Sequence, residues 1–63
     1  MIKVRKATEV KVKVSERLTL NFKRGWMIVD EFNAPMQAAN GQYECYATKK
    51  IAQREADYLN SCL

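Results

Sequence analysis

A run of alternating residues decides the fold of this protein: residues 10–22 read VKVKVSERLTLNF. Valine alternates with lysine in the first part, and large apolar residues alternate with threonine and asparagine in the second. Successive side chains of a β-strand point to opposite faces, so each part predicts a strand with one apolar face. Three polar residues at 15–17 separate the two parts. The pattern therefore predicts an antiparallel hairpin with strands near 10–14 and 18–23 and with its lysines in solvent.

The next apolar run does not alternate. Residues 26–29 read WMIV, which predicts a third strand near 26–31 that is covered on both faces. In so short a chain, the second face needs cover from a returning loop or from a partner subunit. A homodimer is therefore one expectation.

A helix is predicted near the end of the chain, over 49–60. Thr48 is a suitable N-cap, and Asn60 can end the helix in a left-handed conformation. The apolar side chains recur at helical spacing, at Ile51, Ala52, Ala56, Leu59 and Leu63. Residues 33–42 contain the only proline and an Asn-Gly pair, so they predict a loop. Weaker β signals lie at 36–38 and 43–46.

These elements predict a single domain, 1–63, of the α+β class. We expect a small antiparallel sheet of three to four strands with one C-terminal helix packed on a face. The chain is 48% hydrophobic, which favours a folded protein over a disordered one. It has neither an apolar stretch of membrane-spanning length nor the apolar segment of a secretory leader, so we expect a cytoplasmic protein without membrane contact.

Catalytic and metal-binding residues are poorly represented. The chain has two cysteines and no histidine, so it cannot supply the usual ligands of a zinc site. Cys45 and Glu44 would point to opposite faces of a strand, and the adjacent Asp30 and Glu31 would diverge as well. We therefore predict free thiols, no metal or cofactor, and no enzymatic activity.

Charge is distributed unevenly along the chain. Residues 1–24 contain eight basic and two acidic side chains, whereas residues 25–63 contain three and five. Such asymmetry is typical of a chain that binds a polyanion. The candidate nucleic-acid-binding residues are Lys11, Lys13, Lys23 and Arg24, assisted by Arg5 and Lys6.

Two other interpretations accompany this prediction. Lysines on an exposed strand also protect a sheet from aggregation, without any ligand. Four aromatic residues offer platforms for base stacking or, alternatively, form the core: Trp26, Phe32, Tyr43 and Tyr46.

Residues 43–60, YECYATKKIAQREADYLN, resemble the last strand and helix of the arm-type DNA-binding modules of tyrosine integrases. The resemblance covers less than a third of the chain and implies a sheet face that enters DNA. Those modules have a tight hairpin where this chain has the loop 33–42. Small basic chains of this style are also similar to accessory proteins of bacteriophages and plasmids.

The sequence thus favours a non-enzymatic module that binds nucleic acid through the basic face of its hairpin. The alternative is a small inhibitor or adaptor that docks on a host protein through a strand edge or through residues 33–42.

Overall fold

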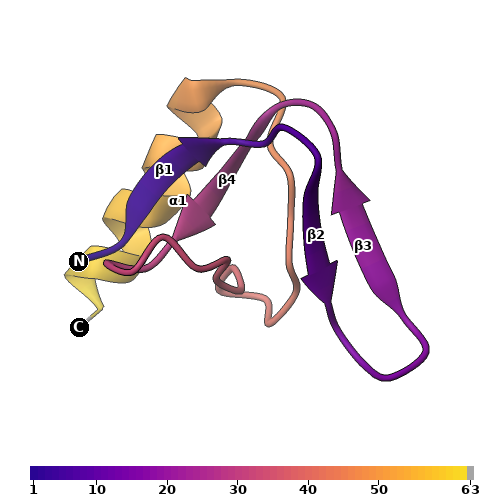
Figure 1. Cartoon of the computed structure of the whole chain (residues 1–63). Helices are drawn as coiled ribbons and strands as arrows, with labels where there is room; N and C mark the ends of the chain where they lie inside the picture. The colour runs from indigo at the N-terminus through magenta and orange to yellow at the C-terminus, as the bar shows by residue number, and fades with distance from the viewer. Residues whose placement is uncertain (63) are drawn as a thin grey trace.

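The regular structure consists of four strands followed by a helix in a computed structural model that describes residues 1–62 (Figure 1). The elements are β1 (Lys3–Lys6), β2 (Val10–Lys13), β3 (Thr19–Phe22), β4 (Trp26–Val29) and α1 (Lys49–Ser61). The α+β class, the antiparallel strands and the C-terminal helix are confirmed. The strands form two separate pairs, β1 with β4 and β2 with β3, where the sequence predicted one sheet.

The two strand pairs are segments of one long hairpin. The ladder runs from Lys3 opposite Val29 at its open end to Lys13 opposite Thr19 near its tip. In both pairs the numbers of facing residues add up to 32, so the two arms have equally long segments between the pairs. The register therefore passes through the interruption unchanged.

The interruption, at residues 7–9 and 23–25, is a bend that shifts the alternation of side chains. Ala7 and Val10 belong to one apolar cluster, although strict alternation would place them on opposite faces. The other arm makes the same shift between β3 and β4. Because both arms shift together, one apolar face continues through the bend.

Gly25 provides a tight contact at the bend. Its φ is +87°, and a Cβ atom there would run into the carbonyl oxygen of Tyr46. The opposite arm also has one residue with a positive φ, Glu9 at 52°. A glycine is required at position 25 because both the backbone conformation and the space exclude a side chain.

Strand β4 is covered on both faces, as its sequence predicted, although β1 is the only strand paired with it within the described residues. Met27, Ile28 and Val29 are each only 1% exposed. Ile28 lies on the face toward α1 and packs with Ala56. On the opposite face of β4, Met27 and Val29 pack with the valines of β2. The returning segment adds half-buried side chains from Tyr43 and Cys45 to this second face. The expected cover is thus present within one chain, and the reason for expecting a homodimer is removed.

The chain between β4 and α1 follows the free edge of β4 without forming another strand. Only single bridges join Val29 to Pro35 and Trp26 to Tyr46. The predicted β segment at 36–38 is therefore absent, and the one at 43–46 is reduced to the single bridge at Tyr46. The predicted turn at Asn40-Gly41 is present, with Gly41 at a φ of +82°.

The helix begins where its sequence predicted. The Thr48 hydroxyl accepts a hydrogen bond from the Ile51 amide at 3.2 Å. Ala52 and Ala56 are fully buried, which allows α1 to pack closely on β1 and β4. The apolar side chains at helical spacing predict a buried stripe, but Ile51 is 44% exposed and does not belong to the core.

The helix does not end at Asn60, because it continues to Ser61 and Cys62 is its C-cap. The Asn60 side chain instead accepts a hydrogen bond from the amide of Ile2 at 2.9 Å and donates to its carbonyl at 3.0 Å. These two bonds tie the start of the chain to the end of α1. The expectation for Leu63 lies outside the described residues.

Within residues 1–62, no helix has both the length and the apolar character needed to cross a bilayer.

Candidate nucleic-acid interface

Lys11 and Lys13 form the uncovered face of the hairpin. They alternate with the buried Val10 and Val12, and all their neighbours across the ladder on this face are polar. Within the described residues, α1 contacts β1 and β4 and leaves β2 and β3 uncovered. The lysine face therefore projects beyond the helix-covered part of the molecule, as Figure 1 shows for the β2–β3 pair.

A second basic cluster lies on the same side of the hairpin, where β1 meets the start of α1. Lys6 faces Trp26 across the ladder, and facing side chains point to the same side of a sheet. The Lys49 ammonium lies 5.6 Å from the centroid of the Trp26 ring, within the range of a cation–π contact. Two lysines thus flank one tryptophan.

The lysine face and this cluster share a side because the apolar face is continuous through the bend. The apolar cluster occupies one side from β4 to β2, so the opposite side carries Lys6 before the bend and Lys11 after it. We name the four side chains Lys6, Lys11, Lys13 and Lys49 the basic side. All four are exposed.

Three other predicted residues lie apart from the basic side or in the bend. Arg5 points to the opposite face, is half-buried, and donates a hydrogen bond to the Asn33 carbonyl at 3.3 Å. Lys23 and Arg24 are exposed in the bend, and the Arg24 carbonyl accepts a hydrogen bond from the Cys45 thiol. Arg5 therefore has a structural contact that separates it from the other candidates.

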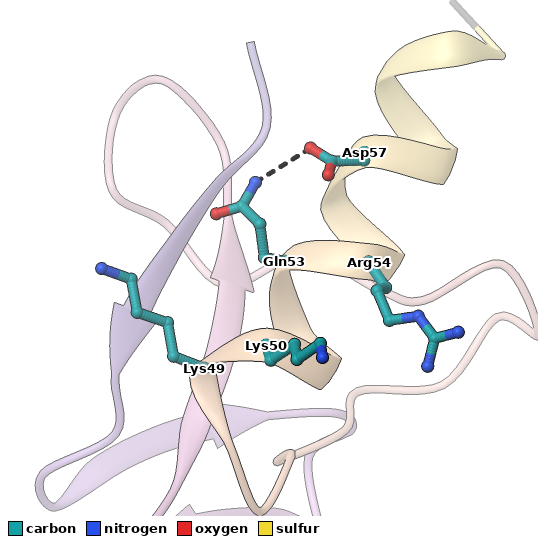
Figure 2. A pocket seen from close by; sticks show the side chains of 5 residues that line it. All are labelled: Lys49, Lys50, Gln53, Arg54 and Asp57. Atoms are coloured by element: carbon teal, nitrogen blue, oxygen red, sulfur yellow. Dashed lines mark hydrogen bonds between the residues drawn. The ribbon is translucent and has the colours of Figure 1, made fainter.

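The start of α1 adds a shallow trough to this region. The trough has a volume of about 430 Å³. Figure 2 shows the side chains that line it: Lys49, Lys50, Gln53, Arg54 and Asp57. All come from one helix, and Gln53 donates a hydrogen bond to Asp57 at 2.9 Å. Without a wall from a second element, the trough cannot enclose a small ligand, and it widens the basic surface instead.

Lys49 was not among the predicted site residues. Its role depends on Trp26, which lies more than twenty positions earlier in the chain, and no local pattern signals that contact. Of the predicted aromatic platforms, Trp26, Tyr43 and Tyr46 are half-buried, while Phe32 is 82% exposed.

Two titratable side chains near the bend have raised pKa values. Burial raises the pKa of the Cys45 thiol, which keeps it protonated and weakly nucleophilic. Burial, and then the nearby Glu55 and Glu44, raise the pKa of Tyr46 to about 12. Both cysteines are free thiols, and residues 1–62 hold no cluster of side chains suited to a metal ion.

No family model, curated protein or solved structure matches this chain. The functional interpretation therefore depends on the geometry of the basic side.

Proposed function

We propose that this protein is a non-enzymatic module that binds nucleic acid through its basic side. The observation that carries this proposal is the projection of Lys11 and Lys13 from a part of the hairpin that the helix leaves uncovered. Residues two apart on a strand are about 7 Å apart, so these ammonium groups can contact separate phosphates. Lys6 and Lys49 extend the same side toward the helix.

The shape of the hairpin favours a duplex ligand. A two-stranded ribbon fits the major groove of B-DNA, which is about 12 Å wide. Phosphate contacts would position the ribbon, and the polar side chains Thr19 and Asn21 beside the lysines could contact base edges.

The test is fluorescence anisotropy across a salt series, with a labelled duplex of about 20 base pairs and with a matching single strand. Four phosphate contacts predict that log affinity falls with log salt at a slope of about −3.6 for the duplex. The double variant Lys11→Gln, Lys13→Gln should flatten this slope by about 1.8 and retain the fold, because both side chains are in solvent.

A matched control is Lys3→Gln, compared with the single variant Lys11→Gln. Lys3 is exposed but lies on the same side as Arg5, away from the basic side. We expect the Lys3 variant to keep the wild-type slope and the Lys11 variant to flatten it by about 0.9. Equal effects would show that only net charge matters and would contradict the assigned side.

The alternative function is docking on a host protein through a strand edge or through residues 33–42. Affinity would then depend on a buried apolar anchor and would lose little in salt. The nucleic-acid proposal fails if neither duplex nor single strand binds more tightly than about 100 μM at low salt, the weak limit of ordinary non-specific binding.

A further inference from the structure

An apolar groove lies at the tip of the hairpin, on the face opposite the basic side. It has a volume of about 380 Å³ and is lined by Val14, Leu18, Leu20, Gln37, Gly41, Gln42 and Tyr43. The sequence predicted that Val14 and Leu18 would be buried, but they are 44% and 50% exposed. The segment that leads from β4 to α1 covers the inner face of the hairpin only as far as the groove. Val14 and Leu18 therefore remain open to solvent.

Phe32 is the complementary feature, an exposed aromatic side chain on a rigid turn. The Asp30 carboxylate accepts hydrogen bonds from the amides of Phe32 and Ala34, at 2.8 and 2.9 Å. Backbone bonds between Asp30 and Ala34 and between Asn33 and Asp30 close the same turn. Because these bonds already hold the backbone of the turn, burial of Phe32 by a partner costs mainly the freedom of its side chain.

The two features lie at different ends of the hairpin and carry opposite charge. The turn at Phe32 follows β4, at the end of the hairpin away from its tip (Figure 1). The groove lies at the tip, because Val14 and Leu18 line it. Asp30 and Glu31 lie at the turn together with Arg5, which binds the Asn33 carbonyl, for a net charge of −1. Lys13, Glu16 and Arg17 at the tip have a net charge of +1, although Lys13 points to the basic side. A chain cannot easily fill its own groove with Phe32, but a second copy can approach with favourable charge.

We propose that a second copy of this chain occupies the groove, with Phe32 of one molecule entering between the hairpin tip and residues 37–43 of the next. This contact joins two different surfaces, so it is head-to-tail and adds further copies unless the geometry closes a ring. Each added copy would present another basic side. The proposal does not depend on nucleic-acid binding and can be tested without any nucleic acid.

The first experiment is sedimentation velocity of the 7.3 kDa protein over a range of concentrations. We expect weight-average mass to rise between about 10 μM and about 1 mM, as for a small and weak interface. Phe32→Ala should weaken association roughly 30-fold, the effect of an aromatic hot-spot residue. Tyr58→Ala is the matched control, because Tyr58 is also exposed, at 57%, but lies on α1.

Mixing two variants identifies the head-to-tail arrangement. Leu18→Gln should damage the groove and leave Phe32 intact, whereas Phe32→Ala does the reverse. Each variant alone should be monomeric, and an equimolar mixture should form a dimer that cannot grow, because only one functional contact remains per pair.

Three results would overturn the proposal. One is a wild-type protein that stays at 7.3 kDa at about 1 mM, which would leave the groove to a foreign peptide. Another is equal weakening by Phe32→Ala and Tyr58→Ala. The third is a mixture of the two variants that remains monomeric while wild type associates.

Discussion

The two halves of the bent hairpin differ in what covers them, although they share one register. The β1–β4 half has α1 on one face and apolar side chains on the other, and its central residues are almost completely buried. The β2–β3 half is covered on its inner face alone, and its outer face consists of lysine, threonine and asparagine. The comparison shows that the same secondary structure supports stability in one half and leaves surface for contacts in the other.

The sharpest test of this contrast compares one large apolar residue from each half. Ile28→Ala should lower the free energy of unfolding by about 3 to 4 kcal/mol, because the site is closed on all sides. Leu18→Ala should cost less than about 1 kcal/mol, because half of that side chain is already in solvent.

Urea titrations followed by tryptophan fluorescence measure both changes. A chain of this length has about 3 to 9 kcal/mol of stability in total, so Ile28→Ala could be largely unfolded. Ile28→Val, with an expected loss of about 1 kcal/mol, then provides a measurable substitute. Similar losses at positions 28 and 18 would show that the two halves are equally buried in solution.

Gly25 lies in the bend between the two halves, and its substitution tests how closely the backbone segments approach there. Gly25→Ala should cost about 3 kcal/mol, since it combines a left-handed backbone with a clash against the Tyr46 carbonyl. Gly41→Ala is the matched control, with a φ of +82° but open space around the added methyl group, and should cost about 1 kcal/mol. Thermal denaturation distinguishes the two. Equal losses of stability in the two variants would show that Gly25 and the Tyr46 carbonyl do not approach closely.

The smallest effect is expected at Tyr46, on the covered half. Its hydroxyl is buried and has no partner at hydrogen-bonding distance and angle within the described residues, although Glu44 lies close enough to help raise its pKa. Tyr46→Phe should therefore raise stability by about 1 kcal/mol at neutral pH. The folded state holds the pKa of Tyr46 near 12, above the ordinary value of 10. The unfolded chain therefore loses this proton first, and wild-type stability falls as pH rises from 10 towards 12.

The phenylalanine variant lacks this contribution to alkaline unfolding, so its advantage over wild type should grow across that pH range. Denaturant titrations at neutral and alkaline pH measure the difference. A variant that is less stable than wild type at neutral pH would mean that the hydroxyl has a hydrogen-bonding partner.

Local patterns predicted the hairpin and the helix well, because each has an unambiguous period and a clear boundary. The switch in period at Thr48 located the start of α1 to the residue. Strand β1 was missed, although Ile2 and Val4 alternate with charged residues there, because its segment is short and rich in cations. The candidate site was predicted in part, since Lys11 and Lys13 lie where alternation placed them, whereas Arg5 lies on the opposite face.

The sequence by itself determined the strands β2, β3 and β4, the helix, and which of their faces are apolar, because these properties depend on neighbours a few residues apart. Only the tertiary structure decided that the two arms shift phase together at the bend, that Lys49 lies over Trp26, and that Asn60 binds the backbone of Ile2. These contacts join residues far apart in the chain, and their geometry depends on how closely the glycine at 25 and the alanines at 52 and 56 let the backbone segments approach.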